Sequence, residues 1–168
     1  MTLEELEQVL AELTDDDVQA FGAPPATEGE LEAAEGLMEC PFHPQHRELL
    51  LRYATLGLQV REGIYTPRKS RVINGADIEP TLVVPGPGDM EELKDKLKVL
   101  SINDIDPNQM PILYCGSNWL FHSDVNGKIS EIYDHRPTDE DCEQDLFALV
   151  AHRAKSFRKH VDEKLRKK

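Results

Sequence analysis

Three side chains that can bind a metal ion stand within seven residues: Cys40, His43 and His46. The pattern Cys-x2-His-x2-His supplies three of the four ligands that a structural zinc ion takes. The other Cys and His candidates are scattered along the chain, at Cys115, His122, His135 and Cys142. Two prolines also restrict the backbone around the motif. We therefore expect a loop before a helix, with Cys40 as a small buried group. Cys40, His43 and His46 remain weak metal candidates, and no cofactor is predicted.

A second motif, Asp124-Val125-Asn126-Gly127, resembles the start of a calcium-binding loop. A calcium loop needs a bidentate Glu at its twelfth position, where this chain has His135. Asn-Gly is instead the strongest short signal for a hairpin turn of type I′, because both central residues of that turn need a positive φ. The sequence therefore predicts a hairpin here, with Asp124 as a turn residue.

The spacing of nucleophiles and bases does not indicate a catalytic site. The serines of the central region lack the G-x-S-x-G pattern of a nucleophile elbow. Gly86-Pro87-Gly88 lacks an amide that a bound phosphate would use. Asp134 and His135 are adjacent at an expected strand end, where neighbouring side chains point to opposite faces and do not form a dyad. The sequence predicts no catalytic residue and no enzyme.

Residues 110–137 must position most of these groups. Three runs, at 112–115, 119–124 and 129–134, are apolar or alternate in polarity, which predicts a meander of three strands. The one tryptophan, Trp119, is expected in the core because large apolar side chains are mostly buried. If exposed, Trp119 and Tyr133 would be natural anchors of a protein interface.

Helices are expected before and after the strands. Thr2 with Glu5 and Thr27 with Glu30 form capping-box patterns. Helices are expected at residues 2–13, 27–40, 44–56 and 89–97, and a long one is expected to begin at Pro137-Thr138. Gly57 is expected to end the helix at 44–56. Further short strands are expected at 58–60, 63–65, 71–73 and 81–84, with a turn at Asn74-Gly75. This order predicts a single α+β domain over residues 1–168, with an antiparallel or partly mixed sheet and a long C-terminal helix packed on it.

The charge is distributed unevenly. Residues 1–39 hold twelve Asp or Glu and no Lys or Arg, within an N-terminal part (1–57) expected to be helical. Residues 152–168 hold eight Lys or Arg and two acidic residues, and the net charge of the whole chain is −13. An acidic body repels nucleic acid and suits a basic partner, although such a charge also serves solubility alone. The basic segment is expected to be the cationic end of a packed helix, which suits the helix dipole, rather than a nucleic-acid or membrane patch.

The sequence also bears on the compartment. It has no run of 18 apolar residues, and its first residues lack a basic region followed by an apolar one. Three cysteines without paired spacing favour a reducing compartment. We therefore expect a cytoplasmic protein without a membrane or direct nucleic-acid partner. The oligomeric state stays open, with a monomer as the default.

Several segments resemble the SUKH superfamily, which includes the fungal Smi/Knr cell-wall regulators and many bacterial immunity proteins. The segments are Phe21-Gly22-Ala23-Pro24-Pro25-Ala26-Thr27 followed by Leu31-Glu32-Ala33-Ala34-Glu35, Cys40-Pro41 to Leu51, Asp106 to Ile112, and Trp119 to His135. The chain departs from the family at Leu56-Gly57, where Asn-Gly is frequent, and matches it poorly over residues 80–100.

The resemblance implies an α+β sheet fold and a non-enzymatic immunity protein that binds and blocks a toxin, often a nuclease. A nuclease needs a basic surface to hold phosphates, and an acidic protein can associate with that surface quickly. The alternatives are a regulatory or scaffolding protein of the same fold that binds a cellular partner, and a metal-dependent enzyme built on Cys40, His43 and His46. The candidate partner-binding residues are Asp104, Asp106, Trp119, His122, Asp124, Tyr133 and Asp134.

Overall fold

The computed structural model describes residues 1–60, 81–100, 106, 108–115, 119–134, 136–138 and 141–165. In chain order its elements are α1 (Leu3–Glu12), β1 (Val18–Gly22), α2 (Glu28–Met38), α3 (Pro44–Arg52), β2 (Leu56–Val60), β3 (Thr81–Val84), the 3₁₀ turn η1 (Pro87–Asp89), α5 (Met90–Leu100), β4 (Met110–Cys115), β5 (Trp119–Ser123), β6 (Ile129–Tyr133), β7 (Arg136–Pro137) and α6 (Leu146–Leu165).

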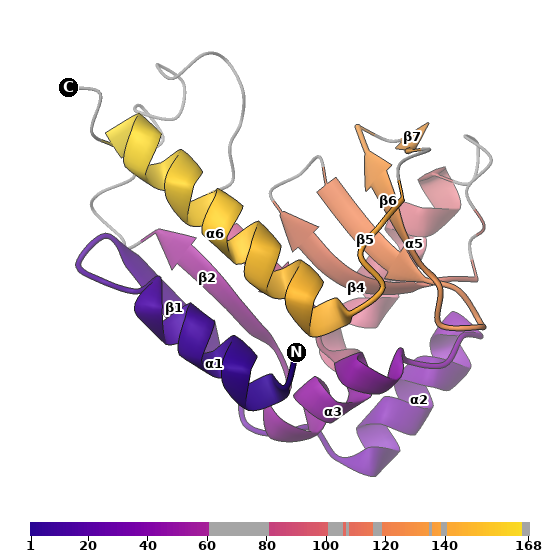
Figure 1. Cartoon of the computed structure of the whole chain (residues 1–168). Coiled ribbons are helices and arrows are strands. Elements are labelled where there is room, and N and C mark those ends of the chain that lie inside the picture. Colours follow the sequence, from indigo (N-terminus) through magenta and orange to yellow (C-terminus); the bar gives the residue numbers. More distant parts are fainter. Residues whose placement is uncertain are drawn as a thin grey trace.

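The strands of the described segments form one antiparallel sheet of seven strands in the order β1 to β7, so each strand pairs with its neighbours along the chain. The long helix α6 crosses the face of the sheet that is turned toward the viewer, and α5 lies behind the sheet (Figure 1). The predicted α+β fold with an antiparallel sheet and a long C-terminal helix is therefore confirmed. The described pairings include no parallel one, so the sheet is not mixed over these residues.

One part of the core lies between α6 and the middle of the sheet, and the buried residues of α2, α3 and α5 belong to the same cluster. The apolar stripe of α6 buries Leu146, Leu149 and Val150, and the helix packs against α1, β3 and β4. On the sheet, Leu58 and Leu82 are fully buried and lie opposite each other in the register of β2 and β3. Burial of each such side chain contributes about 1.5–3 kcal/mol, so this layer fixes the position of α6.

Both predicted capping boxes are present, but the predicted start of the last helix is not. The capping boxes of Thr2 with Glu5 and of Thr27 with Glu30 are both formed. The predicted start of the last helix at Pro137-Thr138 is wrong, because α6 begins at Leu146 and residues 136–137 form the edge strand β7. An edge strand tolerates a proline, which pairs with Ile132 here. The real cap is Asp145, whose Oδ1 accepts the N–H of Ala148 at 3.1 Å.

The sequence predicted that residues 1–57 are helical, and this prediction is wrong for part of the segment. Residues 18–22 form the edge strand β1, which pairs with β2. The third helix ends at Arg52 instead of continuing to Leu56, and Gly57 lies inside β2 rather than after a helix. A Cβ atom at Gly57 would lie 2.2 Å from the backbone oxygen of Leu82. Gly57 therefore allows two strands to approach closely. Glycine is also common after a helix end, so the sequence alone did not distinguish the two roles.

The predicted meander of β4, β5 and β6 is confirmed, but its turn is not of type I′. Only Gly127 has a positive φ, at 77°, and its N–H donates to the carbonyl of Asp124 at 2.9 Å. Asp124 Oδ1 accepts the backbone N–H groups of Asn126 and Lys128 at 2.8 and 2.9 Å. The loop therefore spans three residues, 125–127, and only Gly127 has the left-handed conformation. The hydrogen bonds to the Asp124 carboxylate stabilise this loop.

The middle of the chain agrees with prediction where it is described. The strand at 81–84 is present as β3, and α5 buries Leu93 and Leu97. The expected strands at 63–65 and 71–73 and the turn at Asn74-Gly75 lie outside the described residues. Among the helices of the described segments, none combines the length and the apolar character that crossing a bilayer requires.

Candidate functional site

The Cys40, His43 and His46 side chains have separate structural roles. The Cys40 thiol is buried and donates to the carbonyl of Ser123 at 3.6 Å. His43 caps α3 by accepting the N–H of Gln45 at Nδ1. His46 is fully buried, and its Nε2 donates to the carbonyl of Pro85 at 2.9 Å. Burial lowers the pKa of His46 to about 4, so it is neutral. Within the described segments, no group of three His, Cys, Asp or Glu gathers as a metal site.

The structure separates the predicted partner-binding residues. His122 is only 4% exposed, and burial lowers its pKa to about 4, so it lies in the core rather than on an accessible surface. Asp124 is partly buried in the hairpin loop, whereas Asp106 and Asp134 are exposed. Asp104 and His135 lie outside the described residues.

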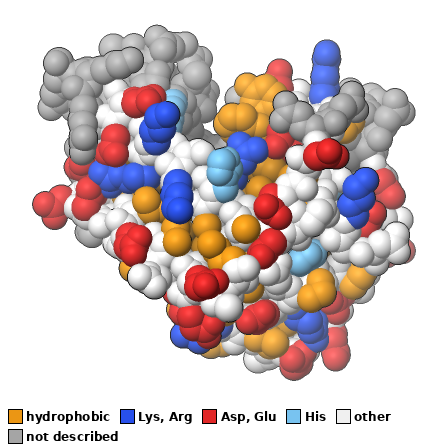
Figure 2. Space-filling model, viewed as in Figure 1, with side chains coloured by type: hydrophobic (Ala, Val, Ile, Leu, Met, Phe, Trp, Pro, Cys, Tyr) orange, Lys and Arg blue, Asp and Glu red, His pale blue; other side chains and the backbone are white. Residues whose placement is uncertain are grey.

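Trp119 and Tyr133 form an exposed aromatic pair. They are opposite each other in the register of β5 and β6, so both side chains lie on the same face of the sheet. Their ring centroids are 4.8 Å apart, and the side chains are 37% and 45% exposed. The expectation that Trp119 belongs to the core is therefore wrong. In Figure 2 hydrophobic side chains reach the surface near the upper ends of β5 and β6, beside basic and His side chains.

This exposure results from the position of α6. The helix covers β3 and β4, and the row of facing residues runs from the buried Leu82 through Cys115 and Trp119 to Tyr133. Among the described residues, this face is partly exposed at the end of β5 and β6 that carries Trp119 and Tyr133, whereas Phe121 and Ile129 on the same face are buried. The aromatic pair thus occupies the border between the covered and the uncovered part of one sheet face.

Arg153 of α6 holds this border in place. Its guanidinium carbon lies 5.1 Å from the centre of the Trp119 ring and 4.7 Å from that of the Phe121 ring. Its Nη2 donates to Glu131 Oε2 at 2.7 Å, and the two side chains are only 21% and 12% exposed. The planar guanidinium can stack on aromatic rings and donate to a carboxylate at once, which a lysine ammonium cannot do. Arg153 therefore ties the start of α6 to β5 and β6.

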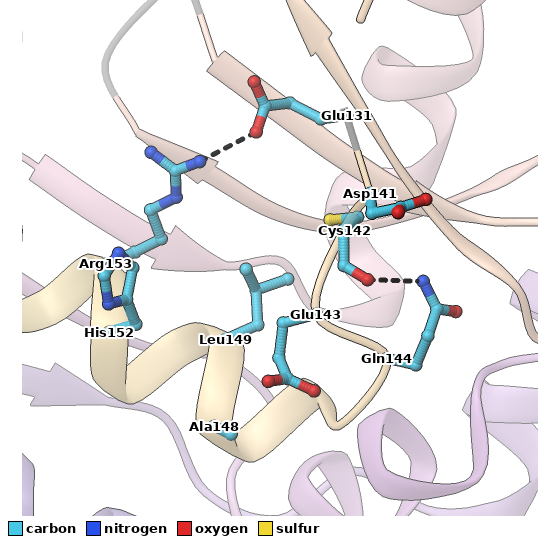
Figure 3. Close-up of a pocket in the computed structure, with 9 residues that line it drawn as sticks. All are labelled: Glu131, Asp141, Cys142, Glu143, Gln144, Ala148, Leu149, His152 and Arg153. Atoms are coloured by element: carbon cyan, nitrogen blue, oxygen red, sulfur yellow. Dashed lines mark hydrogen bonds and ion pairs between the residues drawn. The ribbon is translucent and has the colours of Figure 1, made fainter. Parts of the chain in front are cut away.

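A pocket of about 650 Å³ opens between β6, the segment after β7 and the first turns of α6. It is lined by Glu131, Asp141, Cys142, Glu143, Gln144, Ala148, Leu149, His152 and Arg153. Arg153 and His152 lie at one side of the pocket and residues 141–144 at the other (Figure 3). Because Arg153 also stacks on Trp119, the pocket adjoins the aromatic pair.

Gln144 fixes the wall of the pocket to the outer edge of β6. Its side-chain Oε1 accepts the N–H of Ile129 at 2.8 Å, and its Nε2 donates to the carbonyl of the same residue at 3.0 Å. The amide thus pairs with the strand edge as a neighbouring strand would. These two hydrogen bonds to β6 hold the preceding residues Asp141, Cys142 and Glu143 beside the sheet.

The thiols near this site are not activated. Burial raises the pKa of Cys115 to about 12 and also raises the pKa of Cys142. Both therefore remain protonated at neutral pH, and a protonated thiol is a poor nucleophile. These two thiols are therefore poorly suited to act as nucleophiles.

The sequence pointed to Trp119 and Tyr133 but missed Arg153, Glu131 and the pocket. One signal for Arg153 was present, since it stands four residues after Leu149 and four before Phe157, on the apolar stripe of the last helix. A charged residue on that stripe must either be paired or reach the surface. Its partner Glu131 could not be found in this way, because it lies on a strand 22 residues earlier.

Comparison with known proteins does not assign the chain to a family. No protein-family profile matches it, and no curated protein matches its sequence.

Proposed function

We propose that this chain is a non-enzymatic protein-binding module of the SUKH type, and specifically a cytoplasmic bacterial immunity protein. It would bind a basic toxin domain, such as a nuclease, and block it. The observation that carries the proposal is the exposed aromatic pair of Trp119 and Tyr133 on one face of the sheet. Aromatic side chains that are held in place lose little entropy on binding, and they dominate the energy of protein interfaces.

The charge of the chain supports a basic partner. The net charge of −13 steers a positively charged protein toward the molecule and speeds association. Near the aromatic pair, Asp134, Asp141 and Glu143 are exposed. Arg136 is also exposed on this face, opposite Tyr133, while Arg153 is neutralised by Glu131. The aromatic centre with a charged rim is the usual anatomy of a protein interface.

The direct experiment measures binding and protection together. The chain is co-expressed with the product of a toxin gene adjacent to its own gene, and the affinity of the purified pair is measured by calorimetry. Replacement of Tyr133 by Ala is expected to weaken binding by about 2 kcal/mol or more, which is roughly 30-fold. Leu37→Ala and Leu51→Ala are matched controls, because these side chains are similarly exposed, at 40% and 39%, on other elements.

Absence of both binding and protection of toxin-expressing cells would refute the immunity role. A regulatory or scaffolding protein of the same fold is the alternative, and the gene neighbourhood separates the two. A locus without a toxin gene, together with a cellular protein that requires Tyr133 for binding, would favour the regulator.

A further inference from the structure

The pocket beside the aromatic pair has an excess of negative charge. Three carboxylates line it, from Glu131, Asp141 and Glu143, against the single guanidinium of Arg153. The Glu131 carboxylate is already engaged by Arg153 at 2.7 Å. Asp141 and Glu143 are exposed and line the pocket on the side away from Arg153, with their carboxylates pointing in different directions (Figure 3), and Glu143 Oε1 accepts the backbone N–H of Asp145 at 2.9 Å. Counting His152 as neutral, the lining therefore attracts a cation.

The pocket also has an apolar part. Leu149 is buried, Ala148 is partly buried, and both line the pocket from the first turns of α6. Lysine and arginine side chains pack their methylene groups on such surfaces and keep the charged end near polar groups. The volume of about 650 Å³ lies within the usual range of binding pockets and leaves room for one long side chain with water.

The position of the pocket links it to the interface. Arg153 lines the pocket and stacks on Trp119, so the pocket and the aromatic pair are neighbours, and a partner that packs on the pair can also reach the pocket. A basic side chain at the rim of that partner would meet Asp141 and Glu143. An acidic side chain would meet the same two carboxylates and be repelled.

We propose that this pocket receives an arginine or lysine side chain of the protein partner, with the methylene groups toward Leu149 and the charged end near the exposed carboxylate of Asp141 or of Glu143. This inference rests on the proposed protein-binding function. It adds the chemistry of the partner: a basic residue next to the apolar surface that covers Trp119 and Tyr133.

The test uses small probes, so that it does not depend on the toxin. The acetylated tripeptide amide Gly-Arg-Gly is titrated into the full chain, with Gly-Gln-Gly and Gly-Glu-Gly for comparison. Trp119 is the one tryptophan of the chain, and its fluorescence therefore reports on the border of the pocket. Amide chemical shifts measured by NMR locate binding on the wild-type protein, and the expected changes are centred on Asp141, Glu143 and Arg153.

The variants separate local charge from net charge. The double variant Asp141→Asn with Glu143→Gln is expected to lower the affinity for the arginine peptide by about five- to tenfold, since each exposed ion pair contributes modestly. Glu32→Gln with Glu48→Gln is the matched control, because both residues are exposed on α2 and α3 and the net charge changes equally. The control is expected to bind as the wild type does.

Equal binding of the arginine and glutamine peptides, or shifts that fall outside the pocket, would overturn the inference. So would an equal loss of affinity in the two double variants, because it would show that only net charge matters. If the toxin still binds through Tyr133 while the peptide result is negative, the proposed function stands and the pocket assignment falls.

Discussion

Replacement of Arg153 by Met is expected to destabilise the protein strongly, although the site lies near the surface. The substitution keeps an unbranched apolar stem but removes the guanidinium. That group donates to Glu131 at 2.7 Å and lies against the Trp119 and Phe121 rings. The loss of this single group therefore affects the attachment of α6 to β5 and to β6 together.

The magnitude follows from these contacts. A hydrogen bond between charged groups contributes about 1.5–3 kcal/mol, and the pair is well shielded because the side chains are 21% and 12% exposed. Each stacking contact of the cation adds about 0.5–1 kcal/mol. We expect a loss of about 3 kcal/mol in the free energy of unfolding. For a chain of 168 residues this lowers the melting temperature by roughly 6–12 °C.

Urea unfolding followed by Trp119 fluorescence and by circular dichroism measures this loss. Arg153→Lys keeps the charge but loses the planar stacking, and an intermediate loss is expected. Lys155→Met is the matched control, because Lys155 is exposed on the same helix. A double-mutant cycle with Glu131→Gln should give a coupling of about 1.5 kcal/mol. A loss below about 0.5 kcal/mol for Arg153→Met, or additive effects of the two substitutions, would refute the reasoning.

Two further predictions concern the core. Gly57→Ala places a Cβ atom 2.2 Å from the backbone oxygen of Leu82 and should cost about 2 kcal/mol or more in urea unfolding, whereas Gly88→Ala, with open space around it, should cost under about 0.5 kcal/mol. Equal effects would show that the strands can separate freely. Burial lowers the pKa of His46 and His122 to about 4, below the ordinary value of 6.5, so the unfolded chain binds more protons between these pH values. Stability should therefore fall as the pH drops from about 6.5 to 4, and His122→Gln should reduce this slope in unfolding curves recorded across the window; an unchanged slope would contradict the burial of a neutral His122.

Local sequence signals predicted much of the fold. The two capping boxes act within four residues, so Thr2 and Thr27 mark their helices whatever the rest of the chain does. The alternation in β5 and β6 and the Gly127 turn fixed the meander in the same way. The errors came where distant pairing overrides local pattern. Residues 18–22 form a strand because β2 offers an edge, and no signal within those residues reveals it.

For the candidate site, the sequence by itself determined the residue types: an acidic chain, a tryptophan and a tyrosine on the two sides of a hairpin turn, and an arginine on the apolar stripe of the last helix. The pairing of Trp119 with Tyr133 depends on the three-residue loop, whereas the predicted two-residue turn would place Asp134 opposite Trp119. Only the tertiary structure decided which of them reach the surface. Trp119 and His122 point to opposite faces of β5: Trp119 lies on the α6 face, where it stays partly exposed, whereas His122 is buried on the other face. The burial of a residue depends on which helix packs against its face of the sheet. That helix comes from a distant part of the chain, so the periodicity of a strand alone cannot predict the burial of its residues.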